Sequence, residues 1–567
     1  LDAAGVLQLT NERSVTAGCG LTIATADIQR PAVSWDAAKI AFAARSSAAE
    51  PLRIYEMNAD GSACAAHAAI DATAPTGNGL LIHNFDPAYG PPDAAGVQAL
   101  VFASTRGNLE KAPYDYDGPQ RTPADPSKPN SNLYSYEPDP KNAGAMRTRQ
   151  LTFLLDMERE PAFMADGRVI FTVEKRLQDF HQLSLRRINL DGGDYHPLYG
   201  QRGSIGYYAV SQVVHMSDKN FAAIFADHGV PHRGGTLGVF NRSIGVDFYS
   251  TDATDYVLDP ALATGTSSTQ PSPNFFLHSL HVVDPAATGR ATAGTNGFYT
   301  SPSPLPDGRL LVSFGAGTDA ASFAGDYDVF VMDVSSGQRT QLVGVAGKAD
   351  IEAVAIYGRP VRKVYKSAPT EPNAYGLDES RTNADIIVHD MTTVAAIMMQ
   401  NTPAGRQLDP DLHSFTIYEE LPPPLDLTSF AVSSPNVVKD SIGPIYVRRR
   451  VLGEVPIASD GSARYSLPGG LPLQIRLADT PMSAAKKLPR FLNEHMMFTP
   501  GESVHEAFPH ALFDSFCGNC HGAVSGRPTD VAMRPDIFAG ASRTEALGKV
   551  PTNLDFPPQQ RGTPTGP

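Results

Sequence analysis

Short apolar runs separated by polar turns recur along the first two thirds of the chain. In residues 31–62 an apolar run is followed by a polar turn and a second run, which ends in Asn58-Ala59-Asp60-Gly61. The same order returns at 161–194 and 302–337 and, more loosely, at 86–136 and 210–241. Asp-Gly between apolar runs is a strong hairpin signal. The pattern predicts a mainly β fold built from repeated antiparallel units.

A four-stranded unit that recurs every ~40 residues or more is typical of the blades of a β-propeller. The segment Leu7-Gln8-Leu9-Thr10 has the form of the segments that end a blade, so we expect it to supply the outer strand of the last blade. Residues 1–375 are thus predicted to form a propeller closed by strands distant in sequence. The count is six blades, with seven as the alternative: 31–75, 80–155, 160–200, 205–250, 275–345 and a degenerate 350–375.

The repeats stop near residue 375, and a different pattern follows. Residues 451–480 alternate apolar and polar positions, interrupted by Asp460-Gly461 and Pro468-Gly469-Gly470. This pattern predicts a small β-sandwich or barrel. We therefore expect a β-rich C-terminal domain at 376–480, a segment with a cysteine motif at 481–545 and a Pro/Gly-rich tail at 546–567.

The motif Cys517-Gly518-Asn519-Cys520-His521 carries the clearest chemistry of the chain. Two thiols at this spacing can add to the two vinyl groups of haem, and the histidine can ligate the iron. A zinc site needs four ligands, usually from two such pairs, and no second pair exists. A thioredoxin-like motif needs a βαβ context, which this Pro- and Gly-rich region does not offer. We expect one covalent haem c on Cys517 and Cys520, with His521 as the proximal ligand.

The sixth ligand of this iron decides between an electron carrier and an open catalytic site. His505 and His510 lie just upstream of the motif, and Met533 lies downstream. A histidine is favoured, because too few residues follow His521 to build the helical cytochrome that places a methionine far downstream. His505, His510 and Met533 are the candidate distal ligands.

Histidines in the propeller region form a second group of candidates. His228, His232 and Arg233 lie between two expected strands of the fourth unit. Loops of this kind open around the central channel of a propeller, where ligands bind. These residues are candidates for an additional metal ion or an anionic substrate. Further candidates are His83, His215, His278 and His281.

The net charge and the cysteines limit which partners and which cellular compartment are expected. The net charge of −14 disfavours nucleic acid as a partner. No apolar run is long enough to span a membrane. Covalent haem is attached outside the cytoplasm, so we expect a periplasmic or extracellular protein whose signal peptide has been removed. In that oxidising space Cys19 and Cys64 are expected to form a disulfide.

The order of these parts resembles a known family. The repeats, most clearly IYEMNADGS and FVMDVSSG, are similar to TolB-type propellers. Together with the segment 453–479, the sequence TPGE at 499–502 and the motif CGNCH, they resemble the α subunit of hydrazine synthase and related propeller cytochromes. Two departures stand out: one haem motif instead of two, and Ser525 where the family's catalytic haem is expected to have a tyrosine. The resemblance implies the architecture and a periplasmic redox role, but not hydrazine synthesis.

The sequence is compatible with two functions. In the first, the protein is a monohaem cytochrome that transfers electrons, with the propeller as a scaffold in a larger redox assembly of cytochromes or other subunits. In the second, it is a hydrazine-synthase-like or quinohaemoprotein-type oxidoreductase whose catalytic centre in the propeller channel feeds electrons to the haem. Eight-bladed quinone propellers depend on repeated tryptophans, and this chain has only Trp35.

Overall fold

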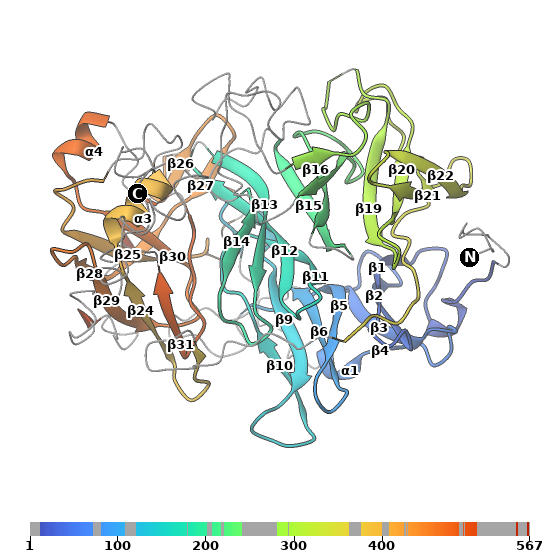
Figure 1. The fold of residues 1–567 in the computed structure, drawn as a ribbon, viewed down its shortest axis with the longest axis horizontal. Coiled ribbons are helices and arrows are strands. Elements are labelled where there is room, and N and C mark those ends of the chain that lie inside the picture. The colour runs from blue at the N-terminus through green and yellow to red at the C-terminus, as the bar shows by residue number, and fades with distance from the viewer. Residues whose placement is uncertain are drawn as a thin grey trace, which may run out of the picture.

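The computed structural model is mainly antiparallel β structure, which confirms the prediction of a mainly β fold (Figure 1). In that figure the C-terminal strands lie on one side of the molecule and the N-terminal strands on the opposite side. The residues that the structure describes are 12–71, 81–107, 121–178, 180–200, 207–216, 220–240, 280–292, 294–361, 376–399, 408–424, 427, 429–431, 433–486, 491–492, 494–506, 552–553 and 564–565.

Five four-stranded units account for most of the N-terminal part. The first consists of β1 (Asp27–Val33), β2 (Lys39–Arg45), β3 (Arg53–Asn58) and β4 (Ala65–Ala66), and the second of β5 (Asn84–Pro92), β6 (Gln98–Ser104), β9 (Asn132–Pro138) and β10 (Met146–Gln150). The third contains β11 (Glu158–Phe163), β12 (Val169–Leu177), β13 (Phe180–Ile188) and β14 (His196–Tyr199). The fourth contains β15 (Ala209–His215), β16 (Phe221–Ala226), β17 (Thr236–Phe240) and β18 (Leu280–Val282), and the fifth β19 (Phe298–Pro304), β20 (Leu310–Gly315), β21 (Asp328–Asp333) and β22 (Gln338–Val343).

The strands of these units are apolar on both faces near their centres, since each unit packs against its neighbours. In β2, five consecutive residues from Ile40 to Ala44 are buried. The third and fourth units join into one sheet through a single parallel pair, Leu183 with Ala209. The first strands of successive units lie side by side in the order β1, β5, β11, β15 and β19. These strands therefore form the inner wall around a common axis.

Each inner strand carries a bulge at the same place. One residue there has a left-handed backbone, and the register with the second strand shifts at that point. These residues are Arg30, Asp86, Glu160, Gln212 and Ser301, with φ between 51° and 58°. A non-glycine residue in this region is strained, so a repeated occurrence requires compensation from its surroundings.

Hydrogen bonds between neighbouring units supply that compensation. The Glu160 N–H donates to the Asp86 carboxylate (2.9 Å), and the Gln212 N–H donates to the Glu160 carboxylate (2.8 Å). The Ser301 N–H donates in the same way to the Gln212 side chain (2.7 Å). Glu352 is a sixth left-handed residue (φ 59°), and its carboxylate accepts from the Arg30 N–H. We call these six residues the bulge ring.

Residues 350–361 lie between the fifth unit and the first. On the side of the fifth unit, the Asp350 N–H donates to the Tyr327 carbonyl (2.8 Å). On the side of the first unit, the Arg359 N–H donates to the Trp35 carbonyl (2.8 Å). The segment Leu7–Thr10, predicted to close the last blade, lies outside the described residues, as do residues 362–375.

Two sheets around one apolar core form the C-terminal domain. Their strand orders are β23-β31-β24-β29-β32 and β30-β25-β28-β33. Ile386, Phe415, Tyr465, Leu467 and Ile475 are central to the core. The elements are β23 (Gly376–Leu377), β24 (Asn383–Val388), α3 (Met391–Met399), β25 (Ser414–Glu420), β26 (Val437–Lys439), β27 (Pro444–Tyr446), β28 (Arg449–Pro456), β29 (Ala463–Pro468), β30 (Leu473–Leu477), α4 (Pro481–Lys486), β31 (Glu502–Glu506), β32 (Thr552–Asn553) and β33 (Pro564–Thr565).

The sheet extends past the boundary predicted at residue 480. Strand β31, which the sequence pattern assigned to the segment 481–545, lies between β23 and β24. Its alternation buries Val504 in the domain core. The chain that leads to the cysteine motif is therefore part of the sandwich.

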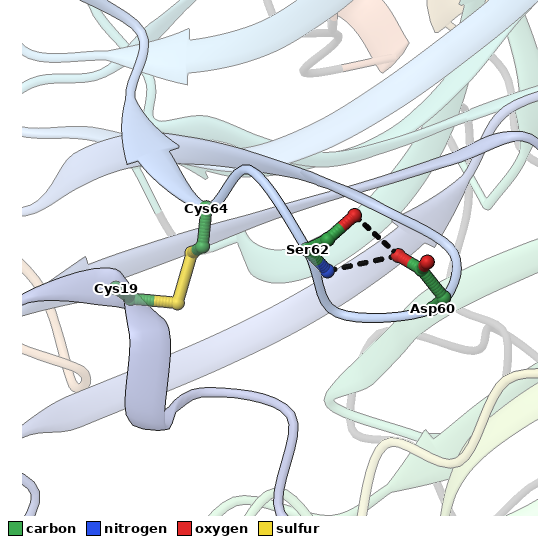
Figure 2. Close-up of a disulfide and its surroundings, with 4 residues drawn as sticks. All are labelled: Cys19, Asp60, Ser62 and Cys64. Carbon is green, nitrogen blue, oxygen red and sulfur yellow. Dashed lines mark hydrogen bonds between the residues drawn. A yellow bond between two sulfur atoms is a disulfide. The ribbon is translucent and has the colours of Figure 1, made fainter.

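The N-terminal region is fastened to the first unit by a disulfide between Cys19 and Cys64, as predicted (Figure 2). Cys19 ends the short 3-10 helix η1 (Ala17–Cys19), and Cys64 lies directly before β4. In the turn before Cys64, the Asp60 carboxylate accepts hydrogen bonds from the Ser62 N–H (2.9 Å) and hydroxyl (2.6 Å). The remaining short elements are α1 (Ala68–Asp71), β7 (Arg121–Thr122) and β8 (Asp125–Pro129).

Candidate functional site

The haem motif itself lies outside the described residues. This applies to Cys517, Cys520 and His521, and to the candidate ligands His510 and Met533. The structure describes the chain up to Glu506. The nearest described part of the chain before the motif is strand β31.

The sequence Thr499-Pro500-Gly501-Glu502 fixes the start of that strand. The buried Glu502 carboxylate accepts from the Thr499 N–H (2.9 Å) and from the Asp194 N–H of the third propeller unit (2.8 Å). Burial raises the pKa of Glu502 to about 8. Gly501 has φ +82°, and a Cβ there would lie 2.0 Å from the Asp378 carbonyl oxygen, so only glycine fits. One short motif thus ties β31 to both the sandwich and the propeller.

Two imidazoles meet where β31 leaves the sheet. His505 Nδ1 lies 3.0 Å from His389 Nε2, and β31 runs parallel to β24 with Ile387 beside His505. Burial lowers the pKa of both histidines, which favours the neutral form that can bind a metal. The ten residues 507–516 then lead to Cys517 and can span at most roughly 35 Å. A haem on the cysteine motif is therefore within reach of this pair.

The sequence pointed to His505 but missed His389. Both follow alternating apolar residues, yet no local pattern indicates that their strands pair across more than 100 residues. Among the described residues, no group of three or more His, Cys, Asp or Glu side chains is placed to hold a metal ion. The two histidines offer one axial ligand with a hydrogen-bonding neighbour, and not a complete metal cage.

A second charged cluster joins the propeller to the sandwich. His495 Nδ1 lies 2.5 Å from the Asp156 carboxylate, and its Nε2 lies 3.7 Å from Glu420. All three side chains are largely buried. Burial opposes protonation of His495, but Glu420 and Asp156 outweigh it and raise the pKa of the imidazole. Burial also raises the pKa of Glu420.

The structure places the propeller histidines apart from one another. His228 packs edge-on against Tyr208, with ring centroids 4.8 Å apart, and His232 packs against Phe323 at 5.9 Å. His83 accepts a hydrogen bond from the Leu52 N–H through Nδ1 (3.2 Å). His281 is in β18, and His278 lies outside the described residues.

Arg233 and His215 lie near the propeller axis. Arg233 bridges Glu160 and Glu352 of the bulge ring. His215 lines a cavity on the axis, described below. Two of the candidate residues, Arg233 and His215, thus lie in the interior of the propeller.

Proline follows four of the six bulge-ring residues in the sequence. Arg-Pro, Asp-Pro, Glu-Pro and Ser-Pro stand at 30–31, 86–87, 160–161 and 301–302. Aligning the repeats on these prolines would have marked four of the six positions, but not the bonds between them. The side chains of three of these residues, Arg30, Asp86 and Glu160, interact with the neighbouring unit, and their type varies from unit to unit.

Comparison with known proteins places the fold in the class of β-propeller proteins. No protein-family model matches the chain, and no curated protein sequence does. Hydrazine synthase from Kuenenia stuttgartiensis is similar in structure, with a TM-score of 0.56 and 15% identity over 90% of this chain. This chain spans 64% of the length of that one. A TolB protein from Agrobacterium tumefaciens matches 58% of this chain and 86% of its own, with 15% identity and a TM-score of 0.31.

The similarity to hydrazine synthase is one of fold. It extends over both the propeller units and the C-terminal sandwich, because 90% of the chain is covered. Within the described residues no helix is long and apolar enough to cross a membrane.

Proposed function

We propose that this protein is an extracytoplasmic monohaem c-type cytochrome that transfers electrons within a larger redox assembly. The observation that carries the proposal is the Cys517–His521 motif, which begins ten residues after β31, a strand that pairs within the sandwich and is hydrogen-bonded to the propeller through Glu502. A donor or acceptor of electrons must keep its haem at a constant distance from its partners. The strand pairing of β31 and the hydrogen bond between Glu502 and Asp194 serve that need.

The propeller in this proposal is six-bladed. Six bulge-ring residues support this count, since Glu352 repeats the backbone conformation found in the five complete units. Residues 350–361 would then provide the inner part of the sixth blade. Residues 1–11 and 362–375 are the segments available to complete it.

Within the haem site, Cys517 and Cys520 would hold the porphyrin and His521 would be the proximal ligand. We assign His505 as the sixth ligand, with His389 orienting its ring through the other nitrogen. A haem with two histidine ligands supplies one-electron transfer at low potential. The disulfide Cys19–Cys64 agrees with an oxidising compartment. Partner proteins would be other cytochromes or subunits of a redox complex.

Absorption spectra of the purified protein test the haem and its ligands. The wild type should carry one covalent haem with a low-spin spectrum and no shift with carbon monoxide. His505→Ala should become high-spin and bind carbon monoxide after reduction, whereas the control His83→Ala should not. A protein without covalent haem would refute the cytochrome, and a shift caused by His510→Ala instead would refute only the assignment of His505.

A second function is favoured by the cavity on the propeller axis. A hydrazine-synthase-like or quinohaemoprotein-type oxidoreductase would place its catalytic centre there and pass electrons to the haem. An additional metal or quinone, detected by metal analysis or by absorption after haem extraction, would support this function. A wild-type protein that lacks both and does not respond to carbon monoxide would argue against it.

A further inference from the structure

A cavity of about 460 Å³ lies on the propeller axis, on one side of the bulge ring. Residues of all five units and of 350–361 line it. Its size falls in the range of small-molecule sites. Four prolines follow bulge-ring residues and form part of its wall: Pro31, Pro87, Pro161 and Pro302. Since proline has no N–H, these four residues offer apolar surface and no donors.

Aromatic rings complete the wall, and their polar atoms are occupied by protein partners. Trp35 Nε1 donates to the Tyr89 carbonyl (2.8 Å), and the Tyr89 hydroxyl donates to Glu56 (2.6 Å). The Tyr357 hydroxyl donates to the Pro304 carbonyl (3.1 Å). The rings therefore present flat apolar surface to the cavity.

The charges around the bulge ring balance one another. Arg30 lies 3.8 Å from Asp86, and Arg159 lies 3.9 Å from Glu160. The third guanidinium, on Arg233, bridges Glu160 and Glu352. Three guanidinium groups thus face three carboxylates, and the ring leaves no net charge for a ligand.

Arg359, in contrast, lines the cavity without a carboxylate partner among the residues that the structure describes. Its side chain donates to the Val33 carbonyl and stacks over Trp35, with the guanidinium carbon 5.1 Å from the ring centroid. Burial lowers the pKa of Arg359, because the positive charge is poorly solvated there. A half-buried cation without a counter-ion is poorly solvated, and a bound anion would relieve that cost.

We propose that this cavity binds a small aromatic monocarboxylate, whose carboxylate pairs with Arg359 and whose ring lies against the prolines and Trp35. A single uncompensated guanidinium matches one negative charge and not a polycarboxylate. His215 also lines the cavity, where its Nδ1 accepts from the Ala165 N–H (3.2 Å). Binding does not depend on the haem or on the redox function proposed above.

Titration of the full-length protein with benzoate tests the proposal. Trp35 is the only tryptophan of the chain, so its fluorescence reports directly on this cavity. Calorimetry gives an independent affinity. We expect saturable binding of benzoate and binding of the neutral analogue benzamide that is roughly 10- to 100-fold weaker, the usual effect of a charge-assisted hydrogen bond. Arg359→Gln should weaken benzoate binding by a similar factor.

The matched control is Arg309→Gln, which removes an arginine from a surface turn outside the cavity and should leave the affinity for benzoate unchanged. Benzamide binding as tightly as benzoate would overturn the proposal, whether or not the Arg359 variant folds. Equal affinity of the wild type and Arg359→Gln would also overturn it, as would the absence of saturable binding up to the solubility limit of benzoate.

Discussion

A buried ion pair between the propeller and the sandwich offers a sharp test of how the two domains are joined. Arg176 of β12 makes two parallel hydrogen bonds, 2.7 and 2.8 Å long, to the carboxylate of Asp440 between β26 and β27. The guanidinium also donates to the Gly443 carbonyl (2.9 Å) and the Leu177 carbonyl (2.8 Å). The two side chains are only 2% and 0% exposed.

Replacing Asp440 by asparagine removes the negative charge but keeps the shape of the side chain. The amide oxygen of the new side chain can still accept from the N–H groups of Ile442 and Gly443, which bond the carboxylate in the wild type. Arg176 would then be a buried cation with no counter-ion, which costs about 3–5 kcal/mol. The double variant Arg176→Met/Asp440→Asn buries no charge, so it should be more stable than Asp440→Asn alone.

Thermal and denaturant unfolding of the wild type, the two single variants and the double variant form a double-mutant cycle. Hydrogen exchange at residues 440–443 locates the effect at the domain junction. Asp479→Asn is the matched control, since it is exposed and its partner Arg476, 3.5 Å away, is partly exposed, and it should cost less than about 1 kcal/mol. Additive effects of the two single variants, or a loss below about 1 kcal/mol for Asp440→Asn, would refute the reasoning.

Three further predictions concern the disulfide, a glycine and pH. Replacing Cys19 and Cys64 by serine should cost about 4 kcal/mol in denaturant unfolding, because the bridge spans 45 residues, and a loss near zero would contradict this. Gly501→Ala should cost at least about 2 kcal/mol, clearly more than Gly96→Ala, which has a similar φ in open space; equal losses would contradict the predicted steric clash. The stability lost in His495→Gln should be largest below about pH 6.5 and should decline as the pH rises through the raised pKa of His495, and a pH-independent difference would contradict this.

Local patterns were sufficient to predict the repeated units. Asp-Gly turns and apolar runs mark hairpins within a few residues, and the predicted first unit at 31–75 overlaps β1–β4 at 27–66. The pairing of Cys19 with Cys64 was also predictable, because the other two cysteines belong to the haem motif. In each case the interacting residues are close in sequence or few in number.

Interactions between units were not predictable, because they join residues far apart in sequence. Glu352 accepts from Arg30 across 322 positions, and nothing near Glu352 indicates which unit it adjoins. His389 and His505 meet across 116 positions for the same reason. That Arg359 has no carboxylate partner in the described part of the chain becomes evident only once the carboxylates around the axis have been assigned to other arginines.

The bulge ring explains why the repeats can differ so much in sequence. In each unit the residue before the usual proline position adopts a left-handed backbone, and in three of them its side chain accepts a hydrogen bond from the next ring residue. An aspartate, a glutamate and a glutamine all meet that requirement, since each has an acceptor oxygen. All five units therefore retain the backbone conformation and three retain an accepting side chain, but the residue type is not kept. That freedom lets the same positions also provide charges near the propeller axis, where Arg359 has no carboxylate partner among the described residues.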